Sequence, residues 1–205
     1  SIIGRPRRLS RHRRAAISYT LICEEPVKAL PILIRRIAER LGIYACEIRT
    51  PHRIGRDHMT RSLVANAVRT QRDAVGENGL IVVLYDSDDD TPDAVVESTK
   101  EQLAFASCEA LVFVAVREYE AWLLAGVESL RESSAVIDDA AYEGDPEVPR
   151  DAAGRLGELM TESYRKTLHQ PRFTAQFDID LAAERSPSLR AFVDGVTEAL
   201  RQAAG

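Results

Sequence analysis

Short apolar runs alternate with segments of helical periodicity over residues 15–132. The runs read as strands, and the most apolar of them is the "GLIVVLY" that ends at residue 85. Continuous β-branched runs are typical of parallel strands covered on both faces, whereas apolar residues three and four apart indicate amphipathic helices. The pattern predicts strands over 15–23, 44–50, 79–85 and 110–116, and helices over 27–42, 60–74, 93–106 and 118–132. This alternation predicts an α/β fold with a mainly parallel sheet flanked by helices.

The remainder of the chain reads as an addition to this core. Residues 133–150 carry Gly144, Pro146 and Pro149 and are expected to form a linker or loop. Beyond them the pattern is helical, with Ser186 as a candidate N-cap ahead of Pro187. We therefore expect a basic arm over 1–14, an α/β core over 15–132, a linker over 133–150 and a C-terminal helical extension over 151–205, packed on the core.

The apolar run ending at residue 85 leads directly into "DSDDD". In an open parallel sheet, functional groups gather beyond the carboxyl ends of the strands. If the extended conformation persists for three residues, Asp86 and Asp88 project to the same side. Two carboxylates held together need a cation or a proton between them, and hard oxygen ligands suit Mg²⁺ or Mn²⁺.

Acidic residues follow two further strands. Glu24 and Glu25 come after the first strand, and Glu118 and Glu120 follow the run at 110–116. We expect these groups to meet Asp86 at one crevice. The alternative is that some are carboxylates at helix N-termini, where the helix dipole favours negative charge. That alternative is open for Asp90, Asp93 and Glu120.

Charge is distributed unevenly along the chain. Residues 1–72 carry 16 Lys and Arg against 5 Asp and Glu, a formal charge of +11, while residues 73–205 carry 11 against 27, a charge of −16, and the whole chain carries −5. Arg49, Arg53, Arg56 and the arginines of the arm could face a phosphate backbone, so nucleic acid is a candidate partner. The alternatives are a solvated arm, or one that docks on the acidic half of the same molecule. With 45% hydrophobic residues and no membrane-length apolar stretch, we expect a cytoplasmic globular protein that has no membrane partner.

Several stretches together resemble a bacterial family of unknown function that is regarded as TOPRIM-like. The stretches are "ALPILIRRIAERLG", "VVLYDSDDDTP", "AVREYEAWLLAGVESLR", "YRKTLHQPRFTAQFDIDLA" and "RSPSLRAFV". A Glu after the first strand and an Asp-x-Asp after a later one also resemble the TOPRIM domains of topoisomerases, primases and nucleases of the overcoming-lysogenization-defect type. The resemblance implies that Asp86 and Asp88 bind Mg²⁺ and that Glu24 binds metal or moves a proton. It further implies that Glu118 and Glu120 complete a second metal position, and that Lys166 neutralises developing phosphate charge, unless Lys166 is a plain surface residue.

Two function classes follow from these observations. The first is a Mg²⁺- or Mn²⁺-dependent nuclease, in which the basic half holds nucleic acid near the carboxylates. The second, which rests on the resemblance to effectors of bacterial phage-defence systems, is a non-catalytic module that binds an ATPase partner. The sequence contains no GxxxxGK or GxGxxG loop, so ATP binding would have to come from that partner. Haloacid-dehalogenase and receiver-domain readings fit less well, because the Asp-x-Asp lies mid-chain and "AVREYE" supplies no lysine. The oligomeric state stays open, with a homodimer among the options.

Overall fold

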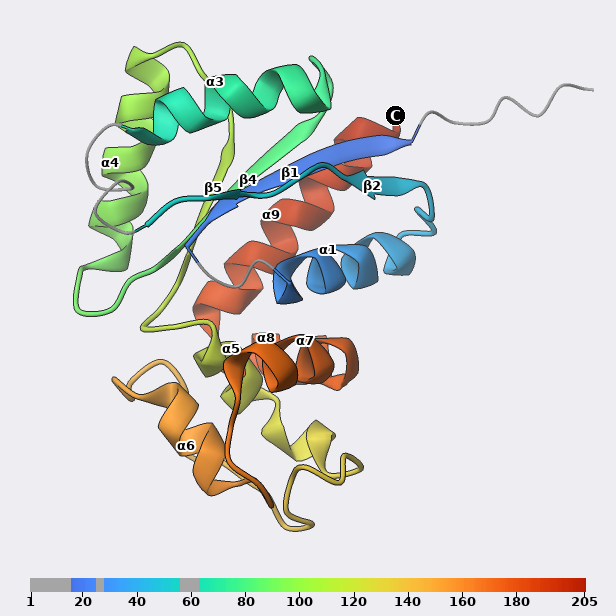
Figure 1. Cartoon of the computed structure of the whole chain (residues 1–205), viewed down its shortest axis with the longest axis vertical. Coiled ribbons are helices and arrows are strands. Elements are labelled where there is room, and N and C mark those ends of the chain that lie inside the picture. Colours follow the sequence, from blue (N-terminus) through green and yellow to red (C-terminus); the bar gives the residue numbers. More distant parts are fainter. Residues whose placement is uncertain (1–15, 25–27, 56–62) are drawn as a thin grey trace, which may run out of the picture.

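A parallel β-sheet forms the centre of the protein (Figure 1). The computed structural model describes residues 16–24, 28–55 and 63–205. The strands are β1 (Ile17–Cys23), β2 (Cys46–Ile48), β3 (His52–Arg53), β4 (Leu80–Asp86) and β5 (Leu111–Ala115). Their order is β2-β1-β4-β5, every pair is parallel, and the short β3 pairs with the carboxyl end of β1 beyond β2. The predicted α/β fold with a mainly parallel sheet is therefore confirmed.

Side chains of β4 alternate between two hydrophobic clusters. Val82 and Leu84 belong to one cluster, and Ile81, Val83 and Tyr85 belong to the other. This is the behaviour expected of a strand whose two faces are both covered, and it explains why β4 reads as a continuous apolar run. By the same alternation Asp86, the last residue of β4, lies on the face of Val82 and Leu84.

Helices cover both faces of the sheet (Figure 1). α3 (Leu63–Val75) and α4 (Pro92–Phe105) pack on one face, and α1 (Ala29–Arg40) and α9 (Pro187–Ala204) pack on the other. The connection after β1 thus runs over one face, while those that enter and leave β4 run over the opposite face. This reversal makes the gap between the carboxyl ends of β1 and β4 a topological switch point, the usual position of a ligand site in such sheets.

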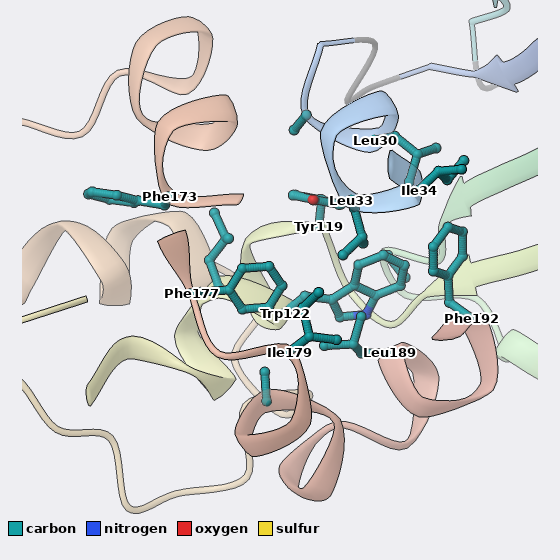
Figure 2. Close-up of a cluster of buried hydrophobic side chains, with 14 of the residues drawn as sticks. Leu30, Leu33, Ile34, Tyr119, Trp122, Phe173, Phe177, Ile179, Leu189 and Phe192 are labelled. Atoms are coloured by element: carbon teal, nitrogen blue, oxygen red, sulfur yellow. The ribbon is translucent and has the colours of Figure 1, made fainter. Parts of the chain in front are cut away.

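A group of short helices extends the fold at the carboxyl ends of the strands (Figure 1). They are α5 (Glu120–Ala125), a 3-10 helix η1 (Val127–Leu130), α6 (Ala152–Glu158), α7 (Lys166–Gln176) and α8 (Ile179–Arg185). Figure 2 shows the hydrophobic cluster that joins these helices to α1 and α9. Trp122 lies at its centre, fully buried between Tyr119 and Phe192, and donates a hydrogen bond from Nε1 to Ser188 Oγ at 2.8 Å. Trp122 is therefore a residue of the hydrophobic core.

The structure departs from the predicted pattern in the helical extension. The helix expected over 118–132 is divided at Gly126 into α5 and η1, and α7 and α8 lie within the predicted helical extension but were not predicted as individual helices. α7 contains Pro171, and an internal proline normally argues against a helix. The cap at the start of α9 is confirmed, because Ser186 Oγ accepts a hydrogen bond from Leu189 N at 3.2 Å.

The expected division into arm, core, linker and extension stays a prediction. Residues of the 133–150 segment, among them Ala135, Val136 and Ala140, are buried in the main hydrophobic cluster. The arm over 1–14 lies outside the described residues. Within the described ranges, no helix is long and apolar enough to cross a membrane.

Candidate functional site

Glu24 and Asp86 lie at adjacent strand ends. Cys23, the last residue of β1, is in register with Leu84 of β4, so Glu24 follows β1 at the level where β4 approaches Asp86. The next strand in the sheet, β5, ends at Ala115 in register with Asp86, and Glu118 and Glu120 follow it. The acidic residues that follow three neighbouring strands therefore converge on the switch point.

Asp86 is the electrostatic centre of this group. Burial is the main reason why its pKa is raised, from an ordinary value of 3.8 to about 8. The carboxylates of Glu120, Glu118 and Glu24 raise the pKa further, and the ammonium group of Lys166 opposes them. Glu24, Glu118, Glu120 and Lys166 thus all lie within electrostatic reach of Asp86. We call Glu24, Asp86, Glu118, Glu120 and Lys166 the carboxylate-lysine cluster.

Glu120, the first residue of α5, is fully buried. Its Oε1 accepts hydrogen bonds from Tyr164 Oη at 2.8 Å and from Gln170 Nε2 at 3.0 Å. Its Oε2 receives no hydrogen bond from any described residue and has Lys166 Nζ at 3.9 Å. A buried carboxylate oxygen in this position can accept a further donor or a cation.

Glu118 is held in place by α6, a different helix of the extension. Its Oε1 accepts a hydrogen bond from the backbone N–H of Ala153 in α6 at 2.8 Å. Burial raises the pKa of Glu118, the hydrogen bond from Ala153 lowers it, and the neighbouring charge of Glu120 raises it again. Glu118 and Glu120 are therefore held by different helices while they share one electrostatic environment.

His169 fixes the turn that carries Lys166. It is fully buried, its Nδ1 accepts a hydrogen bond from Arg165 N at 2.8 Å, and its Nε2 lies 3.2 Å from Glu162 Oε1. Since Nδ1 is an acceptor, Nε2 carries the proton and donates to Glu162. The His169 ring also stacks on Tyr164 at a centroid distance of 5.7 Å. The segment before α7 is thereby pinned, and Lys166 projects from it with a side chain that is 39% exposed.

Sequence reasoning missed Tyr164, Gln170 and His169 as members of this arrangement. Had α7 been recognised, the spacing of four residues between Lys166 and Gln170 would have placed them on one helix face. Tyr164 lies outside any helix, and no sequence signal identified it.

The expected extension of the strand through Asp88 is wrong. β4 ends at Asp86, and Asp88 has a left-handed backbone with φ of 47° and an exposed side chain. The reason is a pairing between the two loops that follow β4 and β5. Asp88 N donates to Arg117 O at 3.1 Å, and the Arg117 guanidinium donates to Asp88 O at 2.7 Å and to Asp89 Oδ1 at 2.8 Å. Asp86 and Asp88 therefore do not project as neighbours from one extended strand.

Two of the three predicted nucleic-acid-binding arginines can be placed. Arg53 in β3 donates a hydrogen bond from Nε to the carbonyl oxygen of Glu24 at 3.1 Å, which puts it beside the carboxylate-lysine cluster. Arg49 follows β2, is about half exposed and lies 3.7 Å from Glu47. Arg56 lies outside the described residues. Of the residues for which a helix-terminal role was the alternative, Asp93 is exposed in the first turn of α4, and Glu120 begins α5.

Among the described residues, no three Asp, Glu, His or Cys side chains are arranged so that they could hold a metal ion as they stand. The donor chemistry nevertheless suits a hard divalent cation. Three glutamates lie within electrostatic reach of Asp86, and Glu120 Oε2 is buried without a hydrogen bond from the described part of the chain. Burial is the main cause of the raised pKa of Asp86, and the neighbouring carboxylates raise it further. The residues fit the expected ion by chemistry and by charge.

A family model described as "Domain of unknown function (DUF4276)" matches residues 26–197. The chain belongs to this family of uncharacterised domains. No curated protein and no solved structure gives a match. The match includes Asp86, Glu118, Glu120 and Lys166 and begins just after Glu24.

Proposed function

We propose that this protein is a Mg²⁺- or Mn²⁺-dependent phosphodiesterase that cleaves nucleic acid, of the TOPRIM-like type that its sequence resembles. The observation that carries the proposal is the convergence of Glu24, Asp86, Glu118 and Glu120 with Lys166 at the switch point of a parallel sheet. Carboxylates crowded into a partly buried site cost free energy when they ionise, and such arrangements are often found at active sites.

Asp86, Glu24 and the Oε2 atom of Glu120 are the groups we assign to an ion, with Glu118 available for a second one. A bound divalent cation would supply charge stabilisation for a phosphodiester and lower the pKa of an attacking water. We leave Asp88 out of this set, because its backbone has left the strand and its side chain is exposed.

The chain's own residues have separate roles in this proposal. Lys166 is the donor to the developing negative charge on the phosphate, since its ammonium group projects beside Glu120 and remains accessible. Arg53 holds the nucleic-acid backbone next to Glu24, and Arg49 extends that contact. Tyr164 and Gln170 are positioning residues, because they fix Glu120 through its other oxygen.

Incubation of the full chain with DNA and with RNA, in the presence of Mg²⁺ or Mn²⁺, tests the proposal. Cleavage by the wild type and its loss in Asp86→Asn and Glu120→Gln is the expected result. Asp194→Asn is the matched control, because Asp194 is an exposed carboxylate on α9 away from the cluster. Equal cleavage by Asp86→Asn and wild type would remove the cluster from the mechanism.

A second candidate function is that of a non-catalytic module that binds an ATPase. This candidate rests on the resemblance of the sequence to effectors of phage-defence systems. The observation that favours it is that Glu118 and Glu120 already accept hydrogen bonds from the helical extension, as structural carboxylates do. A divalent ion separates the two candidates. It should raise the melting temperature of the enzyme by mass action, and much less in Asp86→Asn. No shift would favour the module.

A further inference from the structure

β5 forms one outer edge of the sheet, and its sequence does nothing to protect that edge. Among the described strands it pairs with β4 alone, and it reads Leu111-Val-Phe-Val-Ala115. Natural edge strands usually carry charges, prolines or bulges that discourage pairing with another chain. β5 has no charged residue and no proline, and its register with β4 is uninterrupted.

Backbone geometry identifies the groups that face outward from β5. Ala115 directs its carbonyl oxygen toward β4, because that oxygen accepts a hydrogen bond from Ser87 N at 3.0 Å. Direction alternates along a strand, so Val112 and Val114 direct their N–H and C=O groups to the outer side. The N–H of Val116, two residues after Val114, also points to the outer side, because it donates a hydrogen bond to Ser188 Oγ at 3.4 Å. No residue in the described part of the chain hydrogen-bonds to the outer groups of Val112 or Val114.

A groove of about 590 Å³ runs along this edge. Its floor is β5, and its walls come from α4 and from the start of α9, which Figure 1 shows on opposite faces of the sheet. Pro92 and Val96 line the α4 wall, and Pro187 and Ala191 line the α9 wall. The groove is apolar along its floor and can receive an extended strand.

Charge at the two ends of the groove has opposite sign. α4 runs antiparallel to the strands it connects, so Asp93 lies toward the carboxyl end of β5 and Lys100 lies toward the amino end. Glu147 is also at the carboxyl end, because its Oε1 accepts a hydrogen bond from Ser188 N at 2.9 Å. Glu97 lies between these ends, 3.4 Å from Lys100.

We propose that a second copy of this chain occupies the groove, with its own β5 antiparallel to the first. A two-fold axis that relates the two edge strands makes them antiparallel. Lys100 of each copy therefore meets the acidic end of the groove of the other copy. The outer groups of Val112 then pair with those of Val114 in the other copy, and those of Val114 with Val112, so that the two sheets become one. No residue that lines the groove belongs to the carboxylate-lysine cluster, so this inference does not depend on the proposed nuclease activity.

The mass of the full chain in solution and the exchange of its backbone amides test the proposal together. Light scattering after gel filtration should report twice the 22.7 kDa chain mass at high concentration and the single mass on dilution. Hydrogen exchange at Val112 and Val114 should slow as concentration rises, whereas Phe113, which faces β4, should show protection at every concentration.

Charge variants on the exposed face of α4 supply the matched comparison. Lys100→Glu should raise the dimer dissociation constant about tenfold or more, and Lys100→Glu combined with Glu97→Lys should recover much of the loss. Arg201→Glu, an equal charge change near the end of α9, should have no effect. A chain that stays monomeric, or that dimerises without added protection at Val112 and Val114, overturns the proposal. Dimerisation of Lys100→Glu as tight as that of wild type removes the two-fold arrangement.

Discussion

Lys166 Nζ lies 3.9 Å from Glu120 Oε2, a buried carboxylate oxygen that receives no hydrogen bond from the described residues. The other oxygen of the same carboxylate accepts two hydrogen bonds, from Tyr164 and Gln170. Glu120 is therefore held firmly on one side and left available on the other. One oxygen of Glu120 thus has a structural role, and the other is the oxygen that we assign to a metal ion.

Substitutions of Glu120 should separate its structural contribution from its charge. Glu120→Ala leaves the Tyr164 hydroxyl and the Gln170 amide without their buried acceptor, which should lower the free energy of unfolding by roughly 2–5 kcal/mol. Glu120→Gln keeps an oxygen for both donors and should cost much less. Urea denaturation of the two proteins measures the difference. Equal destabilisation would show that the hydrogen bonds to Oε1 contribute little.

The raised pKa of Asp86 should make stability depend on pH. The folded protein holds the Asp86 proton up to about pH 8, whereas the unfolded chain releases it near pH 3.8. The stabilisation linked to this proton is complete below about pH 4 and is lost as pH rises through 8. Each unit of pKa difference corresponds to about 1.4 kcal/mol, so the change should reach several kcal/mol.

Denaturation curves between pH 4 and 9 in the presence of a chelator measure this dependence. Asp86→Asn should gain stability relative to wild type as pH rises, while Asp194→Asn should follow the wild type. If the difference between Asp86→Asn and wild type is the same at every pH, Asp86 does not titrate in this range.

Gly195 should be intolerant of a side chain. A Cβ at this position would lie 2.6 Å from the ring of Phe113, which packs edge-on against Phe192. Gly195→Ala should therefore lower stability by about 1–3 kcal/mol by forcing α9 away from β5. Gly157→Ala is the control, because its Cβ would make an ordinary 3.6 Å contact with Tyr164 and should gain up to about 1 kcal/mol of helix propensity. Thermal unfolding of both variants measures the contrast.

Arg53 should contribute to nucleic-acid affinity through charge alone. Arg53→Ala and Arg49→Ala should weaken binding to all sequences alike, and each should reduce the slope of log affinity against log salt by about 0.7–0.9. Fluorescence anisotropy with labelled single- and double-stranded oligonucleotides at several salt concentrations measures the slope. Arg201→Ala is the control. An unchanged slope in Arg53→Ala would place the phosphate path elsewhere.

The parts of the fold that follow from local patterning were predictable, and the parts set by tertiary pairing were not. β4 is recognisable because its β-branched run serves two covered faces. The approach of Glu24 to Asp86 follows from parallel strands ending at one edge. The turn at Asp88 does not, because Asp can occupy the left-handed region and the contacts with Arg117, which follows a different strand, hold it there. Pro171 concealed α7, and with it Gln170, one of the two hydrogen-bond partners of Glu120.

Titration calorimetry with Mn²⁺, on metal-free wild type and Asp86→Asn, tests the central claim most directly. The claim is that the carboxylates at the ends of β1, β4 and β5 share a divalent cation. We expect saturable binding of one or two ions to the wild type, with release of a proton near pH 7, because Asp86 must ionise to bind. Asp86→Asn should lose both the binding and the proton release. Absence of binding to the wild type, or equal binding by the variant, would contradict the account.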